Sequence, residues 1–308
     1  MTTRKLVSET TGPVTIDAEL LGHGGLVTVR AEAACTRATL TIHTADESGS
    51  AADVVKDATL FQTGDRLRAI VQGSGGNNGS TIVVGGNTVV QSIGNLNGSM
   101  TGMVINGSGV VVGGNVVAGD VVINGVRVGG GAVIKGSSPI EITAVVPEGS
   151  SVHGYTQSAD VLALGALLNV TAKTQSGSLQ TEHVSRVEAK TQSGSITVEQ
   201  AAEIQAKTQS GSIRLGRTDV VTAKTMSGSI SIQDFGGTAR TESMSGSIRI
   251  HATAGGDVHA KTMSGSINVT ATSAALADDL DVRAKSMSGR ITTPQRPMGG
   301  TSAPRRRR

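Results

Sequence analysis

The sequence predicts an all-β fold whose main part is a parallel β-solenoid. One observation is a seven-residue motif, Lys-Thr-Gln-Ser-Gly-Ser-Ile at residues 190–196, which appears in seven related copies. A second is that the residues on both sides of each copy alternate between apolar and polar, as in strands. A repeat this short cannot bury an apolar face alone, so each copy must pack on its neighbours. The central glycines of the copies are Gly177, Gly194, Gly211, Gly228, Gly246, Gly265 and Gly289, at intervals of 17, 17, 17, 18, 19 and 24 residues.

Each copy predicts one coil made of a strand, a corner, a second strand and a loop. In the copy at residues 186–198, the alternation runs up to Gln192 and starts again at Ile196. Between them lies the corner Ser193-Gly194-Ser195, and glycine suits a tight bend because it tolerates positive φ and close backbone approach. The copies lack the regularly spaced Asn-Gly turns that a β-meander would need, so a solenoid is favoured.

Stacked coils would place equivalent residues in columns about 4.8 Å apart. Apolar and small columns would form a narrow core, which explains how a chain with 1% aromatic residues can fold. We expect a parallel column of hydroxyls to hydrogen-bond along the stack, since an unpaired buried hydroxyl costs about 1–3 kcal/mol. The core columns are Leu179, Ile196, Ile213, Ile230, Ile248, Ile267 and Ile291; Val170, Val187, Ile204, Val221, Val258 and Val282; and Ala172, Ala189, Ala206, Ala223, Thr241, Ala260 and Ala284. The hydroxyl column is Thr174, Thr191, Thr208, Thr225, Ser243, Thr262 and Ser286.

Residues 1–71 are expected to form an N-terminal β-rich unit with one short helix. The run that starts at Ser50 resembles a capping box and predicts a helix to about Ala58. A hairpin is predicted around Thr63-Gly64-Asp65-Arg66. Strands are predicted from alternation or hairpin flanks at residues 14–20, 26–33, 39–44, 60–62 and 67–71.

Three further segments follow along the chain. Residues 72–138 are a Gly/Asn-rich insert, in which clusters of Val and Ile favour β structure. This insert is interpreted either as further irregular solenoid coils or as a flexible low-complexity segment. Residues 139–293 are predicted to form the Ser-Gly repeat β-solenoid. Residues 294–308 are expected to be a disordered basic tail, and Pro294 and Pro297 cannot donate to a strand ladder.

Composition sets weak bounds on location and partners. The formal charge of +3 is too small to indicate a polyanionic partner by itself, and the one cysteine, Cys35, cannot form an internal disulfide. A single thiol mildly favours a reducing compartment. No apolar run after Met1 is long enough for a signal peptide, and none approaches the length of a membrane span. We therefore expect a cytoplasmic location, while an envelope or extracellular location by a non-classical route stays open.

The repeats also carry a resemblance. The Thr-x-Ser-Gly-Ser-Ile strands follow a strand of pattern Ile-x-Ile-x-x-x-Val-Pro-x-Gly-Ser, which starts at Ile140, and an N-terminal strand–helix unit. Together they resemble the bacterial β-strand-repeat putative adhesin family, a domain of unknown function of the actinobacterial type. The resemblance covers residues 10–71 and 139–293. It implies a right-handed β-solenoid (β-helix) and no catalytic residues. The Asn/Gly insert and the arginine tail depart from the family pattern.

No motif in the sequence indicates catalysis, a cofactor or a metal. A Gly-x-Ser-x-Gly elbow and a Gly-x-x-x-x-Gly-Lys-Ser/Thr loop are both missing, despite 42 glycines. The six histidines show no His-x-x-x-His pair. His251 and His259 are expected on neighbouring coils, where they could approach each other, but separate surface histidines are the favoured interpretation. The sequence thus predicts a protein that is not an enzyme.

Six lysines are predicted to form an outward-facing column. Like charges about 5 Å apart repel, so a column of this kind needs an explanation. One hypothesis is a linear track for a polyanion such as a cell-wall polymer or nucleic acid. The favoured interpretation is that the side chains splay, are offset by neighbours such as Glu188, and discourage aggregation. The column is Lys173, Lys190, Lys207, Lys224, Lys261 and Lys285, with Glu242 as an interruption.

The next column outward changes from amide to thioether along the chain. It contains Gln175, Gln192 and Gln209, and then Met226, Met244, Met263 and Met287. Four exposed methionines would form an apolar stripe suited to docking or dimer formation. If the insert or the tail covers these coils, the same methionines are core residues, and the sequence leaves both interpretations open.

The sequence favours a non-enzymatic, adhesin-like module that presents a repetitive face to a protein, to a cell-envelope polymer or to copies of itself. A cytoplasmic bactofilin-like scaffold that self-associates through the solenoid ends is the alternative. A polysaccharide-active β-helix enzyme is favoured least, because the chain has only three aromatic residues to form a sugar platform. The tail could add weak contact with nucleic acid or anionic lipid through charge alone. Its basic residues are Arg305, Arg306, Arg307 and Arg308.

Overall fold

The computed structural model describes residues 1–22, 24–72 and 138–294, together with seven short strands between residues 81 and 135. The chain divides into two compact units, Met1–Leu162 and Ala163–Arg308. The predicted insert at 72–138 falls largely outside the described residues, and so does the predicted basic tail from residue 295 onward.

The seven short strands between the described stretches pair in antiparallel fashion. β7 pairs with β8, β11 with β12, and β10 with both β9 and β13. Coils of a solenoid would pair in parallel instead. The strands are β7 (Thr81–Val84), β8 (Asn87–Val90), β9 (Val110–Val112), β10 (Asn115–Val117), β11 (Val121–Ile123), β12 (Val126–Val128) and β13 (Ile134–Lys135).

The first unit is a mixed β structure with one helix. β14 pairs in parallel with β3, and β2 pairs in parallel with β6 and β15, while β1–β4, β4–β14 and β5–β6 are antiparallel. Alternation places every second residue of β2 in the core, including Ile16 and Leu20. The elements are β1 (Thr2–Val7), β2 (Thr15–Leu21), β3 (Gly25–Ala31), β4 (Thr39–Thr44), α1 (Ser50–Asp57), β5 (Thr59–Thr63), β6 (Arg66–Gln72), β14 (Ile140–Val146) and β15 (Ser151–Thr156).

Most local predictions for this unit are confirmed, one is wrong, and one strand is additional. The helix and the β5–β6 hairpin form where the sequence predicts them. The capping box does not form, since Gly49 is the N-cap of α1 and no side chain caps it. β1 was not predicted, because this strand is half exposed and begins with the polar run Thr2-Thr3-Arg4.

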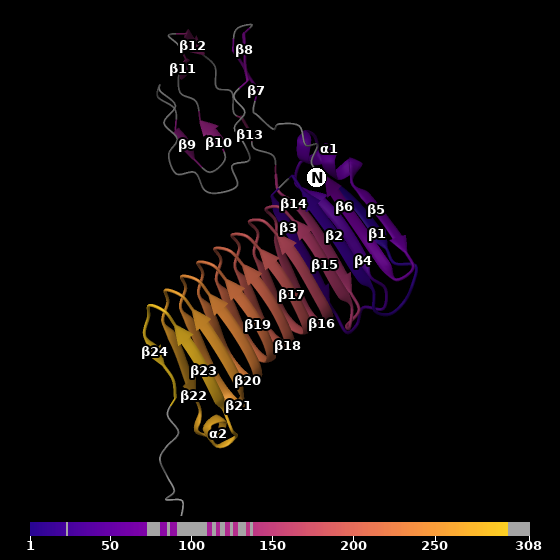
Figure 1. Cartoon of the computed structure of the whole chain (residues 1–308). Helices are drawn as coiled ribbons and strands as arrows, with labels where there is room; N and C mark the ends of the chain where they lie inside the picture. Colours follow the sequence, from indigo (N-terminus) through magenta and orange to yellow (C-terminus); the bar gives the residue numbers. More distant parts are fainter. Residues whose placement is uncertain are drawn as a thin grey trace, which may run out of the picture. The chain divides into compact units, whose positions relative to one another are not determined.

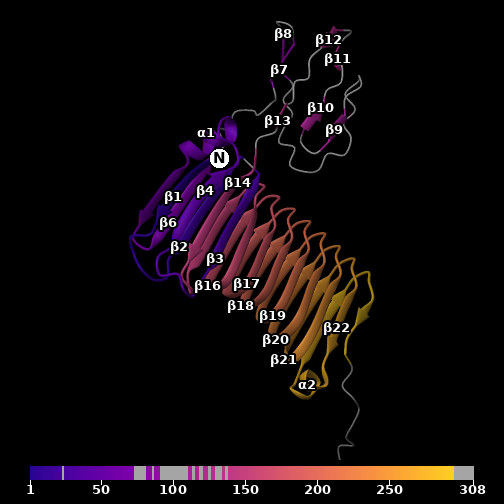
Figure 2. The same ribbon diagram turned by 180° about the vertical axis from the view of Figure 1, so that it is seen from behind.

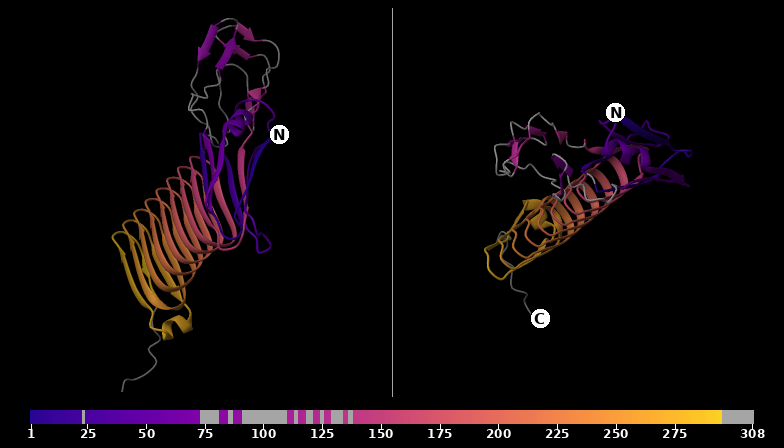
Figure 3. Two further views of the ribbon diagram at one scale, coloured as in Figure 1. Left: turned by 90° about the vertical axis from the view of Figure 1, so that its right-hand side faces the viewer. Right: turned by 90° about the horizontal axis from the view of Figure 1, so that it is seen from above.

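The second unit confirms the all-β fold class and the parallel solenoid. Its coils stack in parallel with residues of the same kind in register, as in Ile196–Ile213–Ile230. Figure 1 shows these coils following one another from β17 to β24, and the side view in Figure 3 shows their corners in a row. The elements are β16 (Asp160–Thr174), β17 (Leu179–Thr191), β18 (Ile196–Thr208), β19 (Ile213–Thr225), β20 (Ile230–Ser243), β21 (Ile248–Thr262), β22 (Ile267–Ala271), α2 (Ser273–Ala277), β23 (Asp281–Ser286) and β24 (Ile291–Thr292).

The coil differs from the predicted one in its loop. The residues predicted to form a loop between two strands stay within one long strand and keep their parallel partners, as His183 does with Gln200 and Arg186 with Glu203. In-register pairing satisfies the backbone there, so each coil from β17 to β21 is one bent strand between two Ser-Gly corners, whereas the next coil is divided into β22, α2 and β23. The short helix α2, which contacts β21 and β22 (Figure 2), was not predicted.

The hydroxyl column forms as predicted. The Thr208 Oγ1 accepts a hydrogen bond from the Gly211 backbone N at 3.0 Å and donates one to the Gly194 carbonyl oxygen at 3.3 Å. Thr191 and Thr225 repeat this arrangement in their own coils. Each hydroxyl therefore ties the corner of its own coil to the corner of the coil before it.

Neither described helix, α1 or α2, is long and apolar enough to span a lipid bilayer.

Candidate functional site

The predicted lysine column exists as a row of in-register residues. Lys190 pairs with Lys207 and Lys207 with Lys224, while Lys261 pairs with Lys285 further along. Glu242 takes the position between Lys224 and Lys261. The first lysine of the column, Lys173, is exposed near the end of β16.

Carboxylates neutralise two members of this column. The Lys190 Nζ lies 2.5 Å from Glu188 Oε1, and this contact holds the pKa of Glu188 below its ordinary value. The Lys224 Nζ lies 2.8 Å from Glu242 Oε2. Within the described residues, Lys207, Lys261 and Lys285 make no ion pair. Lysines without an ion pair within the described residues therefore lie on both sides of Glu242, with Lys207 before it and Lys261 and Lys285 after it.

The methionine column is exposed in the described part of the chain. The exposed fractions are 48% for Met226, 46% for Met244, 42% for Met263 and 75% for Met287. Met226, Met244 and Met263 directly follow buried members of the hydroxyl column, and Met287 follows Ser286, which is half-buried. The sequence also offered a core interpretation, in which the insert or the tail covers these coils, and both of those segments lie largely outside the described residues.

A groove of about 400 Å³ joins the two columns. Lysines and Glu242 line one side, methionines line the other, and small hydroxyl residues lie between them. We call this feature the Met–Lys groove. Its residues are Lys207, Lys224, Glu242 and Lys261; Thr208, Thr225 and Ser243; and Met226, Met244, Met263 and Met287. An apolar stripe beside free ammonium groups suits a ligand that is both apolar and anionic.

Glu242 is the one carboxylate lining the Met–Lys groove. Its Oε2 faces Lys224 at 2.8 Å and its Oε1 accepts from Arg240 Nε at 3.1 Å. These contacts, with the hydrogen bond from Lys224 as the largest cause, hold the pKa of Glu242 below its ordinary value of 4.5.

The lowered pKa predicts how stability depends on pH. Ionised Glu242 stabilises the fold above pH 4.5, and this contribution is lost as the pH falls through the lowered pKa. We expect Glu242→Gln to reduce the free energy of unfolding at neutral pH by less than about 1 kcal/mol, since the pair is partly exposed. Urea unfolding should show the gap to the parent chain closing at acid pH. A gap of constant size would contradict the assignment.

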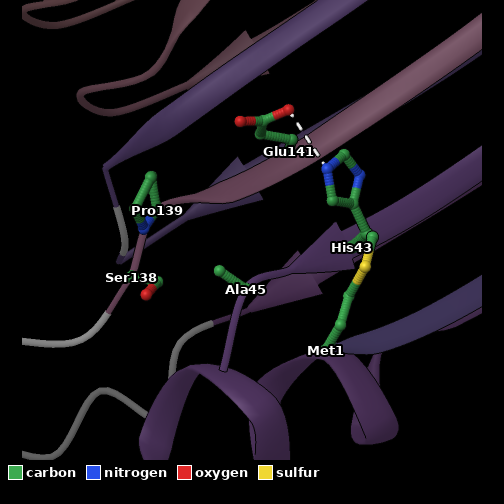
Figure 4. A pocket seen from close by; sticks show the side chains of 6 residues that line it. All are labelled: Met1, His43, Ala45, Ser138, Pro139 and Glu141. Atoms are coloured by element: carbon green, nitrogen blue, oxygen red, sulfur yellow. Dashed lines mark ion pairs between the residues drawn. The ribbon is translucent and has the colours of Figure 1, made fainter. Parts of the chain in front are cut away.

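A second hollow, of about 320 Å³, lies in the first unit (Figure 4). Its lining includes His43 and Glu141, whose Nε2 and Oε2 atoms are 3.2 Å apart, and Ser138. The Ser138 Oγ donates to Asp46 Oδ1 at 2.7 Å. The hydroxyl is thus bonded to a carboxylate rather than to the imidazole, which differs from the arrangement that activates a serine nucleophile.

The described residues contain no cluster of three or more metal-ligating side chains. His251 and His259 lie on the same strand, β21, and not on neighbouring coils as the sequence suggested, because one coil is a single long strand. His251 Nδ1 is 2.9 Å from Thr270 Oγ1. The predicted contact residues Arg305 to Arg308 lie outside the described residues.

Comparisons with known proteins find a matching family model and similar solved structures. The family model Toastrack DUF4097 matches residues 123–305. A solved structure of a putative adhesin from Parabacteroides merdae is similar, with 13% identity, a TM-score of 0.47, and coverage of 95% of this chain and 94% of that chain. Another, a putative cell adhesion protein from Clostridium sporogenes, has 7% identity, a TM-score of 0.26, and coverage of 94% and 98% respectively. The curated proteins give no significant match.

Proposed function

This chain belongs to the Toastrack DUF4097 family, and on that premise we propose that it is a non-enzymatic, adhesin-like binding module. The Met–Lys groove is its binding surface. The observation that carries the proposal is the methionine stripe, whose four side chains remain 42–75% exposed beside free lysines. Burial of a large apolar side chain is worth about 1.5–3 kcal/mol. A partner that covers these methionine side chains would therefore bind favourably.

The fold itself does not need methionine at these positions. Gln175, Gln192 and Gln209 occupy the equivalent place in three earlier coils, where the same corner forms. The backbone bonds are alike, since Gln209 N donates to Gln192 O at 3.2 Å and Met226 N donates to Gln209 O at 3.2 Å. At Met226 the change from amide to thioether therefore alters the surface and keeps this backbone bond, while Met244 N and Met263 N donate to Thr225 O and Ser243 O at 3.3 Å.

Self-association through the solenoid ends is the alternative, and the last coil supports it. β23 pairs with β21 and β24 pairs with β22, and within the described residues no strand pairs with their outer edges. An open edge of this kind can add a further strand. Filaments in electron micrographs of the purified chain would favour a scaffold, whereas monomers by size-exclusion chromatography would favour the binding module.

The binding proposal predicts capture of a small amphiphilic anion. Anilinonaphthalene sulfonate, which pairs an apolar ring system with one negative charge, is expected to bind the parent chain saturably with a blue shift of its fluorescence. A variant with all four methionines changed to glutamine, the residue of the earlier coils, should lose at least about tenfold in affinity. The physical reason is the loss of the apolar side of the groove.

The matched control changes two exposed apolar residues outside the groove, Leu168→Gln and Val220→Gln, which are 49% and 47% exposed. This control should bind the probe as the parent chain does. Far-UV circular dichroism and thermal midpoints must agree among the three proteins, because loosely packed states also bind the probe. Unchanged binding by the four-glutamine variant would refute the groove as the binding surface.

A further inference from the structure

The spacing of the four methionines limits the shape of a ligand that can contact all of them. The residue directly before each methionine pairs in register with its equivalent in the next coil. Thr225 pairs with Ser243, Ser243 with Thr262, and Thr262 with Ser286. The four methionines therefore follow the stacking direction at about 0, 4.8, 9.6 and 14.4 Å, the spacing of parallel strands. A ligand that contacts all of them must repeat an apolar group at nearly this interval.

An α-helix meets this requirement better than an extended chain. Apolar residues at i, i+3, i+7 and i+10 of a helix lie at about 0, 4.5, 10.5 and 15 Å along its axis. An extended peptide presents side chains on one face only every 6.8 Å or so, which leaves the inner methionines between contacts. Methionine side chains are also flexible and polarisable, and such surfaces suit the apolar face of an amphipathic helix.

The charges beside the stripe differ on its two sides. The lysine column lies on one side, and its members Lys261 and Lys285 have no ion pair within the described residues. On the other side the chain continues into exposed corner serines, which carry no charge, such as Ser245 and Ser264, while the corner of the last described coil carries the exposed Arg290. A complementary helix would therefore carry carboxylates along one flank of its apolar face and neutral residues along the other.

We infer that the Met–Lys groove receives an amphipathic α-helix of about three turns, with carboxylates on the flank that faces the lysine column. This inference rests on the proposed function and names the class of partner. Four apolar contacts hold the helix along the stack, and the free ammonium groups of Lys261 and Lys285 set which flank faces them. Glu242, already paired with Lys224 and Arg240, disfavours a second carboxylate at the middle of the groove.

The test uses the full chain and synthetic peptides of about 14 residues, labelled for fluorescence anisotropy. The first peptide has leucines at i, i+3, i+7 and i+10, with glutamates on the lysine-facing flank. A second has the glutamates on the opposite flank, a third has lysines in place of glutamates, and a fourth is a scramble without an apolar face. We expect the first to bind at least about tenfold more tightly than the third and fourth, and more tightly than the second.

Two protein variants assign the contacts. Met244→Gln with Met263→Gln should weaken binding of the first peptide by about tenfold or more. Lys261→Gln with Lys285→Gln should reduce the salt dependence of binding, and should remove the preference for the first peptide over the second. The opposite change, Gln192→Met with Gln209→Met, would lengthen the stripe and should tighten binding of a peptide extended by two turns.

The outcomes separate this inference from the proposed function. If the parent chain binds anilinonaphthalene sulfonate at the groove but binds the scrambled or lysine peptide as well as the first, the helix is the wrong partner and the binding surface stands. If neither probe binds, both proposals are wrong. If sedimentation shows a dimer that the four-glutamine variant does not form, a second copy of this chain is the occupant and the helix inference is overturned.

Discussion

Changing Gly228 to alanine is expected to lower the free energy of unfolding by about 3 kcal/mol or more. A Cβ at this position would overlap the carbonyl oxygen of Gly211 and would lie 2.6 Å from its carbonyl carbon. It would also lie 3.0 Å from the Thr225 Oγ1. The overlapping atoms belong to the backbone of the coil before, so relief requires that two hydrogen-bonded coils move apart.

The neighbouring residue provides the control for this change. Ser227 lies at the same corner, is exposed, and takes part in the stack through its backbone N, which donates to Gln209 O at 2.8 Å. Ser227→Ala keeps that bond and should change stability by less than about 0.5 kcal/mol. Urea unfolding followed by circular dichroism measures both variants. If Gly228→Ala proved as stable as Ser227→Ala, the close stacking of the corners would be wrong.

The second large effect is expected for a buried hydroxyl. Thr208→Val keeps the shape of the side chain but removes its hydrogen bonds with the Gly211 N and the Gly194 O. The Gly211 N–H is then buried without its partner, which costs about 1–3 kcal/mol. The thermal midpoint and the urea midpoint should both fall.

Thr241 provides a matched comparison in the same fold. Its hydroxyl is also buried, at 0% exposure, and has no hydrogen-bond partner within the described residues. It occupies a position that is alanine in the coils on both sides, Ala223 and Ala260. Thr241→Val should therefore be neutral, or should stabilise the chain by up to about 1 kcal/mol. Equal losses for Thr208→Val and Thr241→Val would contradict the role given to the hydroxyl column.

The sequence was sufficient to predict the solenoid, because the spacing of its repeats determines which residues pair between neighbouring coils. A column such as Ile196, Ile213 and Ile230 can be read by counting, and the paired strands confirm it. The first unit could not be treated this way. β2 pairs with β15, and β3 with β14, although the strands of each pair are separated in sequence by more than half the length of the unit and share no motif. Periodicity alone therefore does not indicate these partners.

Two elements escaped prediction for other physical reasons. β1 is an edge strand with little apolar alternation, and its pairing with β4 depends on the backbone. α2 lies in the longest interval between corners, and its length of five residues is too short for a helical period. The interval of 24 residues between Gly265 and Gly289 is visible in the sequence, although it does not indicate a helix.

Part of the candidate site could also be predicted from the sequence, and part could not. The lysine and methionine columns were predictable from the repeat, because each position is one step outward from the buried hydroxyl column. Their chemistry depended on contacts between coils that no repeat reveals. The pairing of Lys224 with Glu242 emerges only from the structure, as do the exposure of Met287 and the lack of an ion pair at Lys261 and Lys285 among the described residues.

We expect the exposed methionines of the last coils to form the binding surface. Methyl NMR of the chain labelled at methionine can show this, because all eight methionines report in one spectrum. On titration with anilinonaphthalene sulfonate, we expect saturable shifts, with one common affinity, of the methyls of Met226, Met244, Met263 and Met287. Unmoved signals from these four methyls, or shifts confined to the other methionines, would contradict this expectation.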